Sequence, residues 1–464
     1  MHWLNRNRYL VLGGALPLLL LLHFYLAGVV IRSSNQDLTA SDQGAEIAMA
    51  KRATGDWVPR QTDGVRHPLW SWTARVVHTP DDGQFFTNGK WLNTAFCLVF
   101  LAIMAVILTR TLDVLAAITW TLLASLGILV VRGTYFQPEP LYYILSLTAM
   151  VLGWWILRGA RSWVYPVFGV VCGLAYLAKP SLLPFLIVFC GSLLLRTVLS
   201  RVMKDMTWKP GRVFAGLGMA FAILAIMLLP LASFSREYYG KPFFNYTKYW
   251  MWMDDFMTEA WPWQDKYPGR VQLDQLPESE RPSLEKYLAR QGWGGLVKRL
   301  ADGTGEVTMK FFFPEPKMSW KALAWKGKEV GNKWGQPLTH RGIYLIGLAG
   351  LVIGLGIWSG RELVPRLATP QNLTALIYVV GLAGFYTLLY GWYYPIGRGD
   401  RFMGSLWMPM LLFLVYAAHR MVERKPNASG VYMAVHGAII LSVLIQALNV
   451  IVLFQQAAYL KTRN

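Results

Sequence analysis

The chain has 464 residues, of which 54% are hydrophobic and only 15% are charged. This composition excludes a single soluble domain of that size and is typical of a polytopic membrane protein. The formal net charge is +19, but the basic residues are spread over loops between apolar runs. Membrane topology and anionic lipids account for such a distribution, so no nucleic-acid partner is expected.

Apolar runs with the length of membrane-spanning helices recur along the whole chain. There are eleven of them, at residues 9–31, 92–110, 113–131, 139–158, 163–178, 181–197, 213–232, 343–358, 373–391, 403–418 and 432–454. The first is long and lacks a convincing small-residue cleavage site, so we interpret it as a retained helix. The predicted fold is an all-α polytopic membrane protein with about eleven transmembrane helices.

The basic loops predict the orientation of these helices. If the amino terminus is cytoplasmic, every short basic loop is cytoplasmic too, as the positive-inside rule requires. The carboxyl terminus is then external. Runs 163–178 and 181–197 could instead form one broken helix, which would reverse everything downstream, but the loop charges argue against it.

Three parts of the chain follow from this topology. Residues 1–232 form an amino-terminal transmembrane module whose external acidic loop covers 32–91. Residues 233–342 form an external loop or small cap rich in aromatic and basic residues, with amphipathic helices at the membrane surface. Residues 343–464 supply the carboxyl-terminal transmembrane helices.

The external acidic loop holds the first candidate site. A short helix is predicted between Thr39 and Ala53, with Asp42 on its apolar stripe and Glu46 one turn later. A carboxylate in that position must be desolvated, paired or held ready for chemistry. The alternative is a charge that complements the helix amino terminus, with Thr39 or Ser41 as the cap.

The same loop continues into Arg66, His67 and Pro68, followed by the letters LWSW. Proline ahead of this aromatic run predicts a second interfacial helix, with Arg66 and His67 at its start. Positive charge there suits an anion. Ordinary contact of Arg, His and Trp with lipid headgroups is the alternative.

Two further charges lie at external helix ends. Glu139 follows a short hairpin, where it can bind a sugar hydroxyl or a metal, or simply complement the helix dipole. Lys179 lies at the turn between two short spans, against the positive-inside trend. It can contact a phosphate, or it can extend its ammonium to the interface.

The last candidate is a cationic loop before residues 403–418. Arg398 and Arg401 lie there beside Tyr394, and two arginines can grip a phosphate bidentately. A structural pair between Asp400 and either arginine is the alternative.

Cofactor motifs are not indicated. The sequence contains no GxxxxGK[ST], HExxH or GxSxG pattern, and the three cysteines, which lie in apolar runs, show no metal-ligand spacing. A divalent metal stays open but no residue pattern indicates one, and no metal ligand is predicted.

The order of these motifs resembles the GT-C superfamily of integral-membrane glycosyltransferases. The likeness rests on Ser41-Asp42-Gln43, His67-Pro68-Leu69-Trp70, PEPL at 138–141, GLAYLAKP at 173–180 and GDRFMGSLWMP near the end. It is closest to the branch that contains protein O-mannosyltransferases and lipid A aminoarabinose transferases, which use polyprenyl-phosphate sugars. Many members carry two adjacent acids where this chain has Asp42 and Gln43, which weakens the case for a metal.

The resemblance and the charge pattern together imply a reaction. A lipid-phosphate sugar is the co-substrate, and a glycan, lipid or protein hydroxyl is the acceptor. Asp42 is the expected base of an inverting displacement. The donor phosphate is assigned to Arg401, Lys179, Arg398 and Arg66, and the sugar to Glu139, Glu46, His67 and Tyr394. The expected location is the bacterial inner (plasma) membrane, with the site on the periplasmic face.

Two other classes remain open on the sequence. A transporter or flippase of a lipid-linked glycan would line its path with similar charges. A non-catalytic assembly subunit would use the aromatic loop as a partner surface. The charges gather at one predicted face and the hydropathy shows no two-half symmetry, which favours the transferase.

Overall fold

The computed structural model describes residues 8–33, 35–39, 42–312, 341–360, 368–397 and 400–461. These residues form helices and loops, with no strand among them. Ten helices in the described part are long and apolar enough to cross a membrane. The all-α polytopic class is therefore confirmed, whereas the number of crossings and the sidedness stay predictions.

The long helices follow the predicted runs closely. They are α2 (Arg8–Ser33), α5 (Asp82–Thr111), α6 (Val114–Ala124) with its continuation through η3 (Ser125–Leu129) and α7 (Val130–Gly133), α8 (Glu139–Leu157), α10 (Leu183–Val202), α11 (Pro210–Tyr239), α17 (Arg341–Ser359), α19 (Pro370–Gly397), α20 (Asp400–Arg424) and α21 (Ser429–Lys461). The shorter apolar helix α9 (Val164–Ala178) matches the fifth predicted run.

The chain breaks between α9 and α10 where the sequence placed a turn. Lys179 has extended backbone angles (φ −155°, ψ 137°), and the short η4 (Pro180–Leu182) follows it. Proline at this point cannot continue the hydrogen-bond ladder of α9. The two helices then pack against different neighbours, α9 between α8 and α11 and α10 against α19, so they are separate helices.

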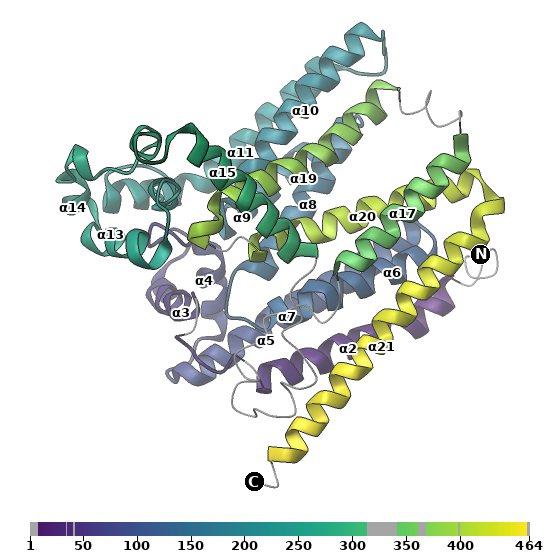
Figure 1. Cartoon of the computed structure of the whole chain (residues 1–464), viewed down its shortest axis with the longest axis horizontal. Coiled ribbons are helices and arrows are strands. Elements are labelled where there is room, and N and C mark those ends of the chain that lie inside the picture. Colours follow the sequence, from purple (N-terminus) through teal and green to yellow (C-terminus); the bar gives the residue numbers. More distant parts are fainter. Residues whose placement is uncertain are drawn as a thin grey trace.

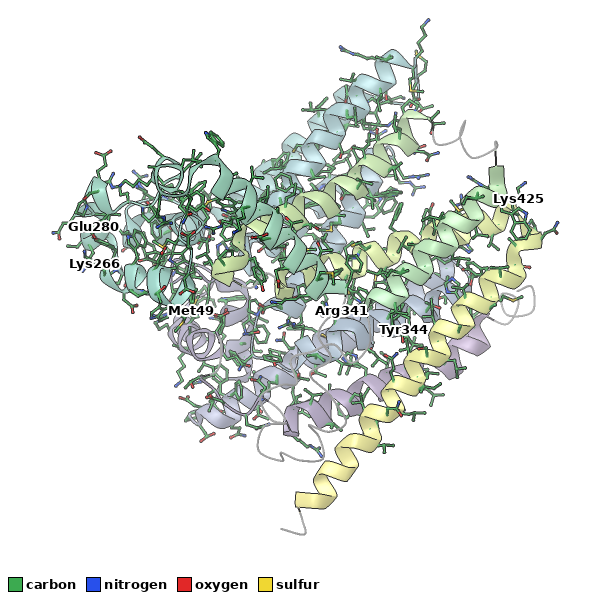
Figure 2. All side chains as sticks on the ribbon, viewed as in Figure 1. Met49, Lys266, Glu280, Arg341, Tyr344 and Lys425 are labelled. Carbon is green, nitrogen blue, oxygen red and sulfur yellow. The ribbon has the colours of Figure 1, made fainter. Side chains whose placement is uncertain are left out.

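Short helices cover one end of the bundle. They are α3 (Gln43–Arg52), η1 (Ala53–Gly55), α4 (Pro68–Ala74), η2 (Arg75–Val77), α12 (Thr247–Trp250), η5 (Phe256–Ala260), α13 (Trp261–Lys266), α14 (Arg270–Asp274) and η6 (Glu278–Glu280), and most of them gather on the left in Figure 1. In Figure 2, Met49 of α3 lies on the same side as Lys266 and Glu280, and Lys425, in the loop before η9 (Pro426–Ala428), lies at the far right.

Residues 240–283, called the cap below, follow α11 and lead into α15 (Leu284–Phe312). The predicted loop started at residue 233, but α11 continues to Tyr239 and ends at Gly240, whose φ of 77° suits a glycine cap. Helix α15 kinks at Gly292 (φ 65°). Residues 313–340 lie outside the described part.

Backbones approach closely where α15 crosses α19. A Cβ added to Gly303 would lie 1.9 Å from the carbonyl oxygen of Gly391, so neither position has room for a side chain. Arg299, one turn earlier, donates to the carbonyls of Trp392 (3.1 Å) and Met253 (2.7 Å). These contacts fix the cap to the membrane helices.

Candidate functional site

Helix α3 is shorter than predicted and faces its neighbours differently. It begins at Gln43, with Asp42 at the N-cap position but without a side-chain capping bond. Thr39 bonds Asp37 instead, and Ser41 lies outside the described residues. The Asp42 side chain is half-buried, with 31% of it exposed, and it is paired with Arg66. The side chains that pack inward include Gln43 and Glu46, because α4 covers the face of α3 that holds them.

Glu46 is the buried acid of this helix. It is 1% exposed, and its Oε2 accepts a hydrogen bond of 2.6 Å from the Ser71 hydroxyl on α4. Burial raises the pKa of the Glu46 carboxyl to about 8, although the Arg66 cation and the Ser71 hydroxyl act in the opposite direction. Glu46 is therefore mostly protonated near neutral pH.

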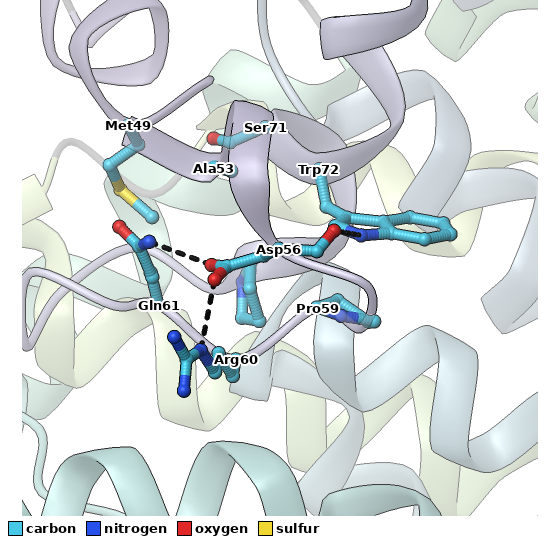
Figure 3. A pocket seen from close by; sticks show the side chains of 9 residues that line it. Met49, Ala53, Asp56, Pro59, Arg60, Gln61, Ser71 and Trp72 are labelled. Carbon is cyan, nitrogen blue, oxygen red and sulfur yellow. Dashed lines mark hydrogen bonds and ion pairs between the residues drawn. The ribbon is translucent and has the colours of Figure 1, made fainter. Parts of the chain in front are cut away.

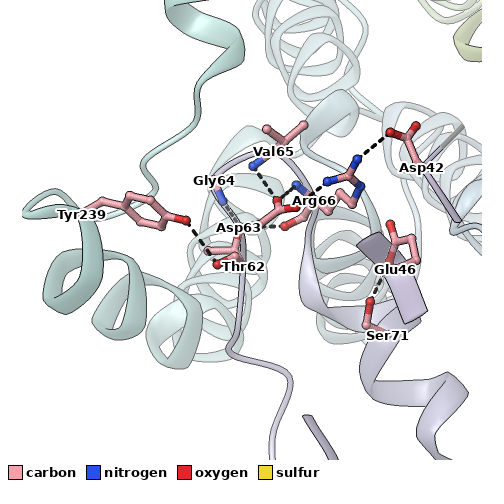
Figure 4. A network of polar contacts seen from close by, with 9 residues as sticks. All are labelled: Asp42, Glu46, Thr62, Asp63, Gly64, Val65, Arg66, Ser71 and Tyr239. Carbon is pink, nitrogen blue, oxygen red and sulfur yellow. Dashed lines mark hydrogen bonds and ion pairs between the residues drawn. The ribbon is translucent and has the colours of Figure 1, made fainter. Parts of the chain in front are cut away.

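Arg66 joins two carboxylates (Figure 4). Its Nη2 donates to Asp42 at 2.7 Å and its Nη1 donates to Asp63 at 2.5 Å. Burial opposes the charge of Arg66, but Asp63 and Asp42 outweigh it and raise the pKa of Arg66 above its ordinary value. Sequence reasoning did not assign a role to Asp63, although its position three residues before Arg66 signalled the pair.

His67 directly precedes α4, as predicted, but its side chain is buried. Its Nδ1 donates to the carbonyl of Tyr176 on α9 at 2.7 Å. The imidazole also meets the Tyr176 ring edge-on, with centroids 5.1 Å apart. Burial lowers the pKa of His67 to about 4, so a neutral ring ties the 62–67 loop to α9.

Glu139 and Lys179 form one ion pair. Lys179 Nζ lies 2.7 Å from Glu139 Oε1, and the two side chains are 14% and 3% exposed. Glu139 starts α8 and Lys179 ends α9, so the contact joins two helix termini. The two residues were assigned separate roles from the sequence, because spacing along the chain could not show that they meet.

Gln43 and Asn93 hold the hairpin before α8. Gln43 Oε1 accepts from the backbone N–H of Phe136 at 3.0 Å, and Asn93 donates to the carbonyls of Tyr135 and Gln137. The hairpin carries Glu139, and Gln43 adjoins Asp42. Contacts thus run from Asp42 through Arg66 and His67 to α9, across the Lys179 pair to α8, and back to α3.

We call this set the polar ring and define it as Asp42, Glu46, Asp63, Arg66, His67, Glu139 and Lys179. It joins six of the predicted site residues with one that was not predicted. Two charged bases face three charged acids outside Glu46, which leaves a net charge of −1. Figure 4 shows the part of the ring on α3 and the 62–66 loop.

The cationic loop is only partly described. Arg398 lies outside the described residues, and Arg401 lies in the first turn of α20 with no described side chain. One turn later, a Cβ added to Gly404 would lie 2.7 Å from Tyr143 Oη. Tyr143 is one turn after Glu139, so the first turns of α20 and α8 lie at the same end of the bundle.

Tyr394 makes its described contacts elsewhere. Its hydroxyl donates to Glu306 at 3.0 Å and accepts from Lys310, and both partners belong to α15. The predicted sugar contact of Tyr394 therefore has no support from these interactions. The sequence could not indicate this, because it did not show that α15 runs beside α19.

Lys90 was missed by sequence reasoning. It is 1% exposed within α5, and its Nζ donates to the Asn35 carbonyl at 2.6 Å and lies 4.0 Å from the Phe86 ring centroid. The Asn35 amide in turn exchanges two hydrogen bonds with Gln43, of 2.7 and 2.8 Å. Lys90 is thus connected through Asn35 to Gln43, the first residue of α3. Its position two residues before the predicted apolar run 92–110 was the available signal.

A hollow is lined by residues of α3, of α4 and of the segment that joins them (Figure 3). Its centre is Asp56, which accepts from Arg60 at 3.0 Å and Gln61 at 2.7 Å, with Met49, Ser71 and Trp72 around it. The space among these atoms is about 180 Å³ including its open side, but no water-sized sphere fits inside. It is a packed polar seam rather than a ligand site.

No group of three or more His, Cys, Asp or Glu side chains within the described ranges is arranged to hold a metal ion. Comparison with known proteins adds no relative: no family model, no curated protein and no solved structure matches this chain. Any function must therefore be argued from the ring itself.

Proposed function

We propose that this integral membrane protein is a glycosyltransferase that moves a sugar from a polyprenyl-phosphate donor to an acceptor hydroxyl. The observation that carries the proposal is the polar ring, in which acids and bases from four separated segments meet at one end of an apolar bundle. A lipid-linked donor presents its phosphate and sugar at that depth. The resemblance to the GT-C superfamily supports the same reading.

The proposed reaction is a displacement at the anomeric carbon. The acceptor oxygen forms a bond to that carbon, and the bond to the phosphate oxygen breaks with its electron pair going to the phosphate. Asp42 takes the proton of the acceptor hydroxyl. Glu46, protonated near neutral pH, is suited to donate a hydrogen bond to a sugar oxygen. The products are the glycosylated acceptor and a polyprenyl phosphate.

The leaving phosphate gains negative charge and needs cations. The ring alone does not supply a surplus, because Arg66 and Lys179 are each paired with acids. Further positive charge must come from Arg401 and Arg398, in the segment that leads into α20. We therefore place the donor phosphate between the ring and the start of α20, on the proposed periplasmic face of a bacterial inner membrane.

The test is turnover by purified protein in nanodiscs. The protein is incubated with radiolabelled polyprenyl-phosphate sugars and, separately, with nucleotide sugars, and release of polyprenyl phosphate is followed. We expect consumption of a lipid-phosphate sugar, by transfer or by slow hydrolysis. Consumption of nucleotide sugars alone, or of neither class, overturns the proposal.

Variants of Arg401 test the phosphate assignment. Arg401→Ala should weaken donor binding as well as turnover, because the contact exists in the ground state and strengthens as charge develops. Arg401→Lys should restore only part of the loss, since a point charge cannot replace a bidentate fork. Unchanged donor affinity in folded Arg401→Ala removes this assignment.

A lipid carrier is the second candidate, and one observation favours it. His23, His419 and His436 are buried within the bundle and contact Ser125, Asp113 and Thr119 on α6 and its ends. Ionisable residues at membrane depth often mark transport paths. Flipping of a fluorescent polyprenyl phosphate across proteoliposomes, without consumption of any donor, would favour the carrier over the transferase.

A further inference from the structure

Two acids contact Arg66, and their surroundings differ. Asp63 is fixed by its own loop: its Oδ1 accepts the backbone N–H groups of Val65 (2.9 Å) and Arg66 (2.7 Å), while its Oδ2 meets the guanidinium. Such a turn is independent of Arg66 side-chain position. Asp63 therefore stays in place whatever the guanidinium binds.

The cap reinforces this loop. Gly64 has a φ of 80°, and a Cβ there would lie 2.6 Å from the ring of Tyr246. The Tyr246 N–H donates to the Gly64 carbonyl at 2.8 Å. The Asp63 turn is thus held between α4 and the cap.

Asp42 is more exposed. It stands at the start of α3, its side chain does not cap that helix, and it is 31% exposed against 20% for Asp63. Its Oδ1 receives Arg66 Nη2 at 2.7 Å. Arg66 Nε is buried and has no hydrogen-bond partner in the described residues, so the guanidinium retains one unused donor beside the Nη2 that Asp42 occupies.

We propose that Asp63 is a positioning residue that lets the donor phosphate exchange with Asp42 on Arg66, so that Asp42 becomes an effective base only after the donor binds. This rests on the proposed transferase function. An oxygen of the donor phosphodiester takes Nη2 and Nε, while Asp63 keeps Nη1. Arg66 is thereby anchored throughout.

The exchange couples the two halves of the reaction. A cation at 2.7 Å stabilises the ionised form of Asp42 and makes it a weaker base. As the phosphate gains its second negative charge, it attracts Arg66 more strongly and the hold on Asp42 weakens further. Proton acceptance and departure of the phosphate then depend on one guanidinium. Without a donor, Asp42 stays paired and unreactive.

The experiment replaces Asp63 with Asn, which keeps the carbonyl that accepts the two backbone N–H groups but removes the charge. Titratable groups close to Asp42 include Arg66 and Asp63 from the loop and Glu46 from α3. Loss of the Asp63 charge leaves Arg66 less neutralised. Undecaprenyl phosphate should then bind about threefold tighter or more.

Turnover should move in the opposite direction. With Asp63 neutral, Asp42 loses a neighbouring like charge, so its pKa falls and it becomes a poorer base. For the lipid-phosphate sugar that the wild type consumes, we expect turnover to fall about 3- to 10-fold and the acid limb of the pH–rate profile to shift down by about one unit. Tighter binding with slower turnover is not the signature of a merely structural residue.

Two further variants complete the test. Asp56→Asn is the matched control: Asp56 lies in the same loop and pairs with Arg60, not Arg66, so affinity and pH profile should match the wild type. Asp63→Glu restores the charge and should bring the acid limb back toward the wild type. An active wild type with an unchanged Asp63→Asn profile, weaker binding, or failure of both Asp63 variants to fold overturns this inference alone, whereas an inactive wild type overturns the transferase as well.

Discussion

The polar ring and the contacts along α6 use buried polar groups in opposite ways. On α6 each group meets a partner from another helix: Ser125 contacts His23 of α2 at 2.8 Å, Thr119 contacts His436 of α21 at 2.8 Å, and Asp113 contacts His419 of α20 at 2.7 Å. These imidazoles are 1%, 0% and 7% exposed. These contacts, with a further one of 2.6 Å from the Tyr432 hydroxyl to Asp113, cross-link long helices.

The ring lies instead on loops, short helices and helix ends, and it holds more acids than cations. One guanidinium serves two carboxylates, and several members keep some exposure. Polar groups that are paired within the packed bundle stabilise helix packing. In the ring, by contrast, Arg66 contacts two carboxylates, and one of these contacts can be exchanged for a ligand. The following experiments test that contrast.

The largest expected effect is on chemistry at Asp42. Asp42→Asn is nearly isosteric and should keep the fold, and the donor should bind at least as tightly as in the wild type because Arg66 is then less neutralised. It should reduce turnover about 10²- to 10⁴-fold, as loss of a general base does. Turnover and donor affinity are measured on the same preparation. Asp82→Asn, which removes the exposed pair with Lys51, is the control. Full activity in Asp42→Asn would remove the base assignment.

Next comes the pair between Glu139 and Lys179. Glu139→Gln leaves a largely buried ammonium without its carboxylate, which should destabilise the protein by about 3 kcal/mol. Equilibrium unfolding in mixed micelles measures this loss. The double variant Glu139→Gln/Lys179→Met should regain part of the stability without regaining turnover. Recovery of both would mean that the pair only supports the fold.

Glu46 makes stability depend on pH. Its pKa is about 8 in the folded protein against an ordinary 4.5, so the folded state binds the extra proton and stability falls as pH rises through 8. The slope is at most about 1.4 kcal/mol per pH unit. His67, with a folded pKa of about 4, adds an opposite slope below about pH 6.5, so the Glu46 contribution is measured as the difference between the wild type and Glu46→Gln at pH 7 to 8. Glu46→Gln should flatten the curve there, and a persisting slope would assign it to another group.

The smallest effect is expected on α6. His436→Leu and Thr119→Val each remove one side of a single hydrogen bond. A double-mutant cycle on unfolding free energy should give a coupling of about 1 kcal/mol. Turnover should stay within about twofold of the wild type in both variants. A larger loss of turnover would break the contrast and bring the α6 histidines into the function.

Hydropathy and proline positions predicted much of the fold. The long helices follow the apolar runs, α4 begins at Pro68, and the break at Lys179 stands where expected. The last turns of α11 and the length of α15 could not be predicted, because helix propensity does not show where tertiary packing stops a helix. Which face of α3 is buried also depends on α4, so the sequence could not show that Glu46 is more deeply buried than Asp42.

The ring shows a similar limit. Candidate residues could be named because charges at helix ends and in aromatic loops are unusual in so apolar a chain. Their partners could not, since the contact between Glu139 and Lys179 joins positions forty residues apart. Asp63 and Lys90 were missed because an aspartate in a turn usually bonds its own backbone and a lysine next to an apolar run usually reaches the interface.

All members of the ring lie between residues 42 and 179. Synthesis runs from the amino terminus, so every ring residue is synthesised before α10. The cap, which begins after Tyr239 and grips the Asp63 turn through Tyr246, is made later. The residues of the polar ring are therefore synthesised first, and the cap, which contacts the Asp63 turn, is synthesised afterwards. Helix α20, which carries Arg401, is synthesised nearly last.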